Sequence, residues 1–359
     1  MKLKVVSGAA ALIVAVLYLA NASWLAHPHG TLTLLAHRGV HQTFSDTGVD
    51  DATCTATRID PPTHAFIENT IPSMRRAFEL GADIVEIDVH PTTDGDFAVF
   101  HDWTLDCRTN GHGVTREHAF ADLRRLDVGY GYTADGGKTF PLRGLGVGLM
   151  PDLAQVLAAF PDRLFLVNIK SNDPHEGEAL AAYIAARAPT ASRRIIVYGG
   201  ERPIARLRAL RPDIEAWTPG QARQCLIRYE LLGWSGYVPR SCRRSMVFVP
   251  EDRAWLIWGW PMRFLARMQA VGSQAYVAGA ITPRMGLAGL DTPVQAARLP
   301  KGWVGGVSTE RIDVVGPLLR PRRAAQSDAR PRGAPDAIVS TAEARAQGST
   351  SCRRRGGRA

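Results

Sequence analysis

Short apolar segments alternate with helix-forming segments along most of this 359-residue chain. The strand candidates lie at residues 32–37, 84–89, 97–101, 164–170, 194–199, 214–219, 273–279 and 303–309. Several of them are separated by helix-forming segments, at residues 72–80, 151–160, 176–188 and 202–211. Such alternation indicates parallel βα units. Eight candidate strands predict an α/β fold, a TIM-type (β/α)8 barrel.

The helix expected at residues 72–80 has recognisable ends. Thr70 is a natural N-cap, Pro72 falls in the first turn, and Gly81 comes just after the last turn. We therefore expect this helix to begin and end sharply.

Two segments interrupt the alternation. Residues 103–150 are rich in Gly, Asp and Tyr and predict a small insertion after the third strand, which shapes the substrate mouth. Residues 220–272 form a second excursion after the sixth strand and bring Trp255, Trp258 and Trp260 close together. Two interpretations are open: these aromatic residues pack on the barrel as a lid or core helix, or they form a lipid-contact surface.

Five ionisable or basic side chains fall at the carboxyl ends of apolar runs. They are His37, Arg38, Glu86, Asp88 and His101. In a (β/α)8 barrel the carboxyl ends of the strands meet at one face, where active sites lie. We expect these side chains to converge in one site.

The chemistry of these residues suits phosphodiester cleavage. Glu86 and Asp88 are two residues apart and share one face of a strand. Adjacent carboxylates repel unless a cation lies between them, which favours a hard ion such as Ca²⁺ or Mg²⁺. His37 and His101 would be the proton-transfer pair. Arg38 offers a planar fork for phosphate oxygens. The pattern predicts a metal-assisted phosphodiester hydrolase.

The order HRG, ENT, E-x-D and HD resembles the glycerophosphodiester phosphodiesterase family, over about residues 32–316. The resemblance implies a TIM-type barrel with one divalent cation, Ca²⁺ or Mg²⁺. It also implies hydrolysis of glycerophosphodiesters to glycerol 3-phosphate and an alcohol. The family's catalytic histidines fall on His37 and His101, and its metal-binding E-x-D falls on Glu86 and Asp88. Its phosphate-binding arginine is Arg38.

The chain departs from the family's pattern at the fourth strand. The family's E-I-K motif aligns with Asn168–Ile169–Lys170. Its glutamate is usually a third metal ligand, whereas Asn168 carries no charge. We expect a weaker metal site, with water or Glu68 of the E-N motif as a substitute ligand. Lys170 would face the phosphate as a point charge, and the alternative is a solvated loop lysine.

Two other functions compete with this prediction. A lysophospholipase D-like or sphingomyelinase D-like enzyme would share the barrel but act on a lipid, and the Trp-rich excursion favours it. A noncatalytic phosphodiester-binding protein would keep the pocket without the metal, and Asn168 favours that alternative. The expected partner is a small-molecule or lysolipid phosphodiester, with membrane-surface contact as a further option and no specific nucleic acid.

The two ends of the chain differ from the barrel, which we expect at residues 31–319. Residues 1–22 predict a signal peptide or a membrane anchor, with Ala20-Asn21-Ala22 as an A-x-A cleavage pattern. We therefore expect an exported protein, periplasmic or extracellular, either released or anchored. Residues 320–359 contribute seven of the nine net positive charges and predict a disordered Arg-rich tail.

Five cysteines are compatible with an oxidising compartment. We expect two disulfides, Cys54–Cys107 at the upper rim of the barrel and Cys225–Cys242 within the second excursion. Cys352 would remain unpaired in the tail. The alternative is that all five are reduced thiols, and no spacing resembles a zinc site.

Overall fold

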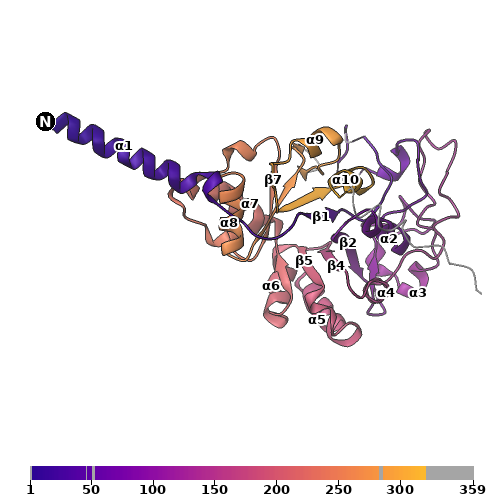
Figure 1. The fold of residues 1–359 in the computed structure, drawn as a ribbon. Coiled ribbons are helices and arrows are strands. Elements are labelled where there is room, and N and C mark those ends of the chain that lie inside the picture. The colour runs from indigo at the N-terminus through magenta and orange to yellow at the C-terminus, as the bar shows by residue number, and fades with distance from the viewer. Residues whose placement is uncertain (1, 46, 51–52, 283–285, 321–359) are drawn as a thin grey trace, which may run out of the picture.

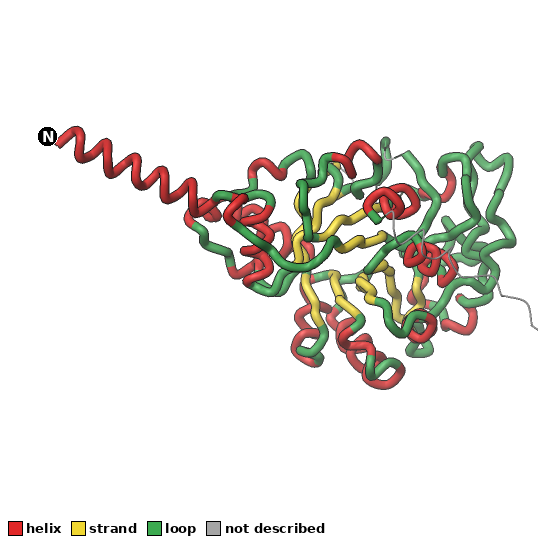
Figure 2. The backbone as a smooth tube through the Cα atoms, viewed as in Figure 1, coloured by secondary structure: helices red, strands yellow, loops and turns green. Residues whose placement is uncertain are grey.

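A computed structural model describes residues 2–45, 47–50, 53–282 and 286–320. Eight parallel strands form a nearly closed barrel, in the order β6-β5-β4-β2-β1-β11-β8-β7 (Figures 1 and 2). Their bounds are β1 Thr33–Ala36, β2 Ile84–Pro91, β4 Leu164–Ile169, β5 Ile195–Gly199, β6 Glu215–Trp217, β7 Met246–Pro250, β8 Gln274–Ala278 and β11 Gly306–Thr309. The predicted TIM-type fold is confirmed.

One predicted barrel strand is wrong, and one barrel strand was not predicted. β3 (Phe97–Val99) pairs antiparallel with β2, with Val89 opposite Val99, and lies off the barrel path. The link between β2 and β3 is a short turn, whereas a parallel neighbour needs a crossover of about a dozen residues. The missing barrel strand is β7, which lies inside the predicted second excursion and pairs with β8. The first insertion therefore follows the second barrel strand and its β3 hairpin.

Helices cover the outside of the barrel and connect its strands. They are α2 Ile71–Glu79, α4 Leu153–Ala159, α5 Pro174–Arg187, α6 Glu201–Leu210, α7 Pro219–Leu232, α8 Met262–Ala270, α9 Pro293–Ala297 and α10 Ile312–Leu319. The expected ends of α2 are confirmed, because the Thr70 hydroxyl accepts a hydrogen bond from the Ser73 N–H and Gly81 has a φ of +102°. The chain also forms the short helix α3 (Phe120–Leu123) and a small hairpin, β9 (Ile281–Thr282) and β10 (Gly286–Leu287).

The interior divides into three apolar clusters. Side chains such as Leu35, Ile84 and Tyr276 fill the barrel itself. A larger cluster lies between the strands and the surrounding helices. The third lies under the first insertion, where Phe120 and Tyr132 are buried. The insertion is therefore a packed cover over the carboxyl end of β2, because it has a core of its own.

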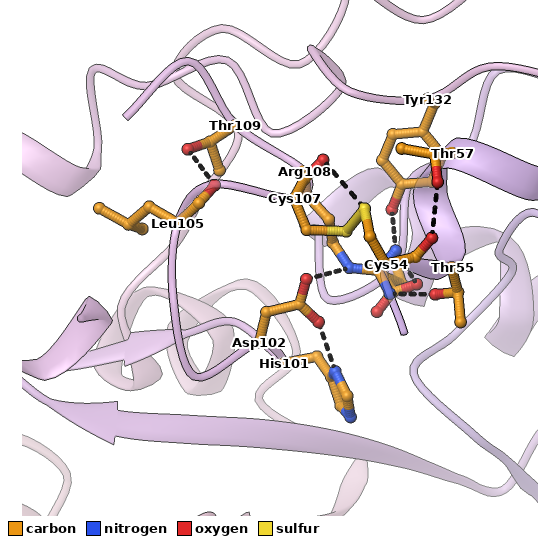
Figure 3. The surroundings of a disulfide bond; sticks show 11 residues. Cys54, Thr55, Thr57, His101, Asp102, Leu105, Cys107, Arg108, Thr109 and Tyr132 are labelled. Carbon is orange, nitrogen blue, oxygen red and sulfur yellow. Dashed lines mark hydrogen bonds and ion pairs between the residues drawn. A yellow bond between two sulfur atoms is a disulfide. The ribbon is translucent and has the colours of Figure 1, made fainter. Parts of the chain in front are cut away.

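Both expected disulfides are confirmed. Cys54 pairs with Cys107 and fastens the loop after β1 to the first insertion (Figure 3). Cys225 of α7 pairs with Cys242, shortly before β7. Cys352 and residues 321–359 of the predicted tail lie outside the described residues.

The Trp-rich segment has two kinds of aromatic side chain. Trp260 packs on Trp303 and Phe264, with ring centroids 5.1 and 5.9 Å apart. Trp255 and Trp258 are instead exposed, at 78% and 42%. Packing therefore explains Trp260 and leaves the other two on the surface.

The first helix, α1 (Lys2–Asn21), projects away from the barrel beside α7 and α8 (Figure 1). It leads through the 3-10 turn η1 (Ser23–Leu25) to the amino end of β1. Among the described residues, no helix combines the length and the apolar character that a bilayer crossing requires.

Candidate active site

The HRG motif makes a sharp turn directly after β1. Arg38 has a left-handed backbone, with φ of +56°, and Gly39 follows with φ of +85°. A Cβ atom on Gly39 would lie 2.3 Å from the Ser73 hydroxyl of α2. Only glycine fits here, because the turn has positive φ and presses against the start of α2. This strained backbone conformation directs the Arg38 side chain toward Asp88.

The ENT motif connects this turn to β2. Asn69 is also left-handed, with φ of +58°, and its N–H donates to the Arg38 carbonyl at 3.0 Å. Its side-chain amide donates to Asp88 Oδ2 at 3.0 Å and accepts from the Asp88 N–H at 3.1 Å. These paired contacts fix the Asp88 carboxylate.

Asp88 lies at the centre of a cluster of cations. Lys170 Nζ is 3.3 Å from its Oδ1, and the Asn168 amide donates to the same oxygen at 2.9 Å. Arg38 Nε is 3.3 Å from Oδ2. Burial by itself would raise the pKa of Asp88, but the charges of Lys170, His101 and Arg38 outweigh it and hold the pKa well below its usual range. Asp88 is therefore ionised.

Glu86 shares the face of β2 with Asp88 but has fewer partners. Its Oε1 accepts from the Tyr198 hydroxyl at 2.8 Å. Its buried Oε2 accepts no hydrogen bond from any described residue and lies 3.6 Å from His37 Nε2. Burial and the neighbouring Asp88 charge raise the pKa of Glu86. A buried carboxylate oxygen without a donor suits a cation ligand.

The other two expected metal ligands differ in their suitability. The Asn168 amide nitrogen faces Asp88, so its oxygen is the atom left to bind a cation. Glu68 is engaged by two arginines, with Oε1 3.2 Å from Arg38 and Oε2 3.1 Å from Arg108. A role for Glu68 as a metal ligand requires it to give up one arginine. Asp88 is also engaged, by Lys170, Arg38 and two amides, so Glu86 Oε2 is the expected ligand atom that no described donor occupies.

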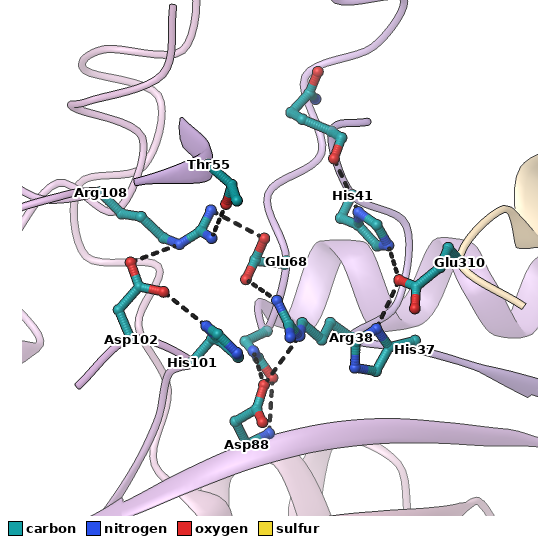
Figure 4. Close-up of polar contacts among 12 residues, drawn as sticks. His37, Arg38, His41, Thr55, Glu68, Asp88, His101, Asp102, Arg108 and Glu310 are labelled. Carbon is teal, nitrogen blue, oxygen red and sulfur yellow. Dashed lines mark hydrogen bonds and ion pairs between the residues drawn. The ribbon is translucent and has the colours of Figure 1, made fainter. Parts of the chain in front are cut away.

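His37 is held by a carboxylate that the motifs did not reveal. Its Nδ1 lies 2.6 Å from Glu310 Oε2, directly after β11, and the same oxygen is 3.1 Å from His41 Nε2 (Figure 4). Burial alone would lower the pKa of His37, but the charges of Glu310 and Glu86 outweigh it and raise it to about 9. His37 is therefore protonated at neutral pH. The ligand atoms of His37, His41 and Glu310 also lie close enough together to share a metal ion.

His101 is held in a similar way but in a different electrostatic environment. Its Nδ1 is 2.7 Å from Asp102 Oδ1, and the other Asp102 oxygen accepts from Arg108 Nε at 2.9 Å (Figures 3 and 4). Burial and the positive charge of Arg38 lower the pKa of His101. His101 is therefore neutral where His37 is protonated.

The eight residues expected in the site fall into two adjoining groups of contacts. His37 contacts Glu86, and next to them Arg38 contacts Asp88, while Glu68 and Arg108 connect Arg38 to His101 through Asp102. The charges of Arg38 and Asp88 act on Glu86 across the two groups. Asn168 and Lys170 join from β4 and the residue after it. The eight positions lie together, as the barrel topology predicted.

Four residues of the network were missed by the sequence reasoning. They are His41, Arg108, Tyr198 and Glu310. Glu310 had a usable signal, because it follows the apolar run GVST at the end of a strand, as His37 and His101 follow theirs. Arg108 had none, because it lies in an irregular insertion and its partners are 6 and 40 residues away.

Comparison with known proteins identifies the family. Residues 37–199 match the model of the Glycerophosphoryl diester phosphodiesterase family. The match spans less than half of the chain, and over these residues the chain is similar to that family. It begins directly after β1, runs through β5 and includes all eight of the expected site residues.

Two curated glycerophosphodiester phosphodiesterases are similar to part of this chain. A glycerophosphodiester phosphodiesterase of Caldanaerobacter subterraneus is 39% identical over 103 residues, covering 29% of this chain and 39% of the relative. One from Bacillus subtilis is 35% identical over 114 residues, covering 31% and 38%. The chain thus matches less than half the length of either relative.

Solved structures of glycerophosphodiester phosphodiesterases share the fold of this chain over most of its length. The glycerophosphoryl diester phosphodiesterase domain of an uncharacterized Mycobacterium tuberculosis protein gives a TM-score of 0.56 at 16% identity, covering 81% of this chain and 99% of that one. A glycerophosphodiester phosphodiesterase from Agrobacterium tumefaciens gives 0.53 at 19% identity, covering 80% and 99%. At these identities the likeness concerns the fold.

Proposed function

We propose that this protein hydrolyses glycerophosphodiesters to glycerol 3-phosphate and an alcohol. The observation that carries the proposal is the pair of histidines, His37 and His101, each held by a carboxylate on either side of the Arg38–Asp88 cluster (Figure 4). Phosphodiester hydrolysis needs an acid for the departing alcohol and a base for the incoming hydroxyl. Two histidines in different electrostatic environments supply both.

The acid and base roles follow from the two environments. His37 holds its proton because Glu310 and Glu86 stabilise the imidazolium, so it is the proposed acid that protonates the leaving oxygen. His101 is neutral because burial and Arg38 disfavour its charge, so it is the proposed base that accepts the proton of the nucleophile. Asp102 orients His101 through Nδ1 and leaves Nε2 for this step.

The phosphate is proposed to bind between Arg38 and Lys170. Both side chains are partly exposed, at 17% and 19%, and both contact Asp88. A divalent cation held by Glu86 and Asp88, with the amide oxygen of Asn168, would offset charge on the nonbridging oxygens. The arginine supplies a planar donor pair and the lysine a point charge.

The activity test uses the full chain with glycerophosphocholine and divalent cation, and measures glycerol 3-phosphate and choline. We expect His37→Ala and His101→Ala each to lower turnover by on the order of 10² or more, because each removes a proton-transfer group. His112→Ala is the matched control, since His112 is exposed and pairs only with Asp106 among described carboxylates. Full activity in both site variants would overturn the assignment.

A second experiment tests the cation site through Asn168. Asn168→Glu adds the carboxylate that the family usually has. The new negative charge would face Asp88, and a bound cation would relieve the repulsion between the two carboxylates. We expect this variant to bind Mg²⁺ or Ca²⁺ about tenfold more tightly in titration calorimetry, in line with the effect of one ligand-shell group. Asn172→Glu, two residues after Lys170, is the control. Unchanged affinity in Asn168→Glu would place the ion elsewhere, with His37, His41 and Glu310 as the next candidates.

The lipid-directed alternative is tested with the same assay. Its support was the Trp-rich excursion, but Trp258 contacts the last turn of α7 and not the site. We expect faster choline release from glycerophosphocholine than from lysophosphatidylcholine. The reverse order would favour the lysophospholipase D-like function, and no release from either, with intact binding, would favour the noncatalytic one.

We also propose that the protein folds in an oxidising, exported compartment. Four of its five cysteines form disulfides, and disulfides persist mainly in such compartments. Thiol alkylation of the protein isolated from its native cells tests this proposal, which requires Cys54, Cys107, Cys225 and Cys242 to resist labelling without reductant.

A further inference from the structure

We propose that the amino end of the barrel is a docking surface for an anionic lipid bilayer. The surface consists of the second half of α1, the turn η1, the end of α7 and the turn η5 (Gly233–Ser235). Its side chains are apolar or aromatic and exposed, and basic residues flank it. The proposal rests on this end of the molecule alone and is independent of the proposed activity.

The second half of α1 presents large apolar side chains to solvent. Leu12, Val16 and Leu19 are 66%, 56% and 47% exposed, and Ile13, Val14 and Tyr18 on the other faces of the helix are exposed to a similar extent. Figure 1 shows the helix standing clear of the barrel. Exposed apolar surface of this extent marks an interaction site.

Specific hydrogen bonds fasten the base of α1 to the barrel. Arg267 of α8 donates to the Asn21 side-chain oxygen and to the Ala20 carbonyl, each at 3.0 Å. The Asn21 amide in turn donates to the Trp234 carbonyl at 2.8 Å. Ala22, the last residue of the A-x-A pattern, is buried. The folded barrel therefore holds the base of α1 in place.

Aromatic and aliphatic side chains surround the base of α1. Trp24 of η1 and Leu231 of α7 are 65% and 68% exposed, and Trp234 and Tyr237 are also exposed. Trp258 joins them, because its indole donates to the Glu230 carbonyl at 2.8 Å. Tryptophan and tyrosine favour the boundary between acyl chains and water, since their rings are apolar and their polar atoms can remain hydrated.

The charge of this region complements an anionic membrane. Residues 219–250 contain five arginines and one acidic residue, Glu230. Arg228 and Arg240 are exposed and lie within a few residues of Leu231 and Tyr237. Basic side chains next to an apolar contact zone strengthen binding to negatively charged headgroups. A second protein copy would meet the same five positive charges, so the charge favours a lipid surface.

The proposed surface lies at the opposite end of β1 from the active site. The chain enters β1 from η1 at Thr33, whereas His37 and Arg38 follow its carboxyl end at Ala36. A protein docked in this way holds its site toward the aqueous phase.

The test measures sedimentation of the full chain with vesicles of phosphatidylglycerol mixed with phosphatidylcholine, and with vesicles of phosphatidylcholine alone. We expect the triple variant Trp24→Ser, Leu231→Ser, Trp234→Ser to lose more than about tenfold in affinity, because three apolar side chains no longer leave water. Arg228→Gln with Arg240→Gln should lose on the order of tenfold on the anionic vesicles only.

Matched controls separate docking from folding. Leu145→Ser with Val147→Ser changes two similarly exposed residues of the first insertion, at the other end of the barrel, and should leave vesicle binding unchanged. The docking variants should keep the thermal unfolding of the wild type and its activity in solution. Equal vesicle binding by the wild type and the triple variant overturns the proposal. So does a second outcome, in which the wild type binds no vesicles but forms a dimer in analytical ultracentrifugation that the triple variant abolishes.

Discussion

Charged side chains are usually exposed and large apolar side chains usually buried, and the two ends of this barrel depart from this rule in opposite ways. At the carboxyl end, ionisable groups such as Asp88, Glu86 and Arg108 are buried. At the amino end, apolar residues such as Trp24 and Leu231 are exposed. Buried charge and exposed apolar surface both cost stability, so each marks a place where function outweighs packing. The comparison separates a chemical end from an interaction end on one scaffold.

The largest difference between the two ends is expected in the loss of unfolding free energy when an arginine is replaced. Arg108 is 3% exposed and pairs with Asp102 and Glu68 at 2.9 and 3.1 Å. Arg108→Met should lower the free energy of unfolding by about 3–5 kcal/mol, because Asp102 loses its arginine and the buried Glu68 keeps only Arg38. Arg228→Met at the amino end should change it by less than about 0.5 kcal/mol. Urea unfolding measures both, and equal effects would remove the energetic contrast between the ends.

A smaller effect is expected from pH, and only at the carboxyl end. The folded pKa of His37, about 9, lies above the unfolded value near 6.5. Its contribution to stability is therefore fully present below about pH 6.5 and is lost as pH rises through about 9. With His37 28% exposed, we expect a loss on the order of 2 kcal/mol.

The variant Glu310→Gln isolates this contribution. It removes the carboxylate 2.6 Å from His37 Nδ1, so the fall in unfolding free energy between about pH 6 and pH 9.5 should shrink. The exposed His112 serves as control, because His112→Ala should keep the wild-type pH dependence. An unchanged pH dependence in Glu310→Gln would show that Glu310 does not stabilise the His37 imidazolium.

The smallest contrast is between the two disulfides. Cys54–Cys107 closes a separation of 53 residues near the site, whereas Cys225–Cys242 closes 17 residues beside α7. By loop-closure entropy, the paired Ser variant of the first should lose about 1 kcal/mol more than that of the second. Denaturant unfolding of both double variants measures the difference. A reversed order would mean that native-state contacts, and not loop length, decide the contribution.

Most of the site could be predicted because each motif lies where a strand ends. His37, Glu86 and His101 follow or lie in apolar runs whose carboxyl ends must meet in a barrel. The glycine of HRG is explained only by the structure, since its missing Cβ makes room for Ser73. The place of Glu310 directly after a strand was a usable local sign, but its contact with His37, 273 residues away, could come only from the structure.

One segment was assigned to the barrel although it forms a hairpin, because its local sequence pattern suits both arrangements. Residues 97–101 are as apolar as a barrel strand, and periodicity does not distinguish an antiparallel hairpin from a parallel neighbour. The short turn before Phe97 carried the decisive information, because it is too short for a crossover. β7 was missed because its five residues, Met246–Pro250, lie within a segment that is rich in tryptophan and arginine.

By itself the sequence determined the class of fold and the end of the barrel at which the expected site residues gather. These features depend on local periodicity and on where polar residues follow apolar runs. Only the tertiary structure decided that Glu310 holds His37, that Arg108 connects Glu68 to Asp102, and that part of the Trp-rich segment stays exposed. Those outcomes depend on barrel closure, which brings distant segments together and leaves one end uncovered.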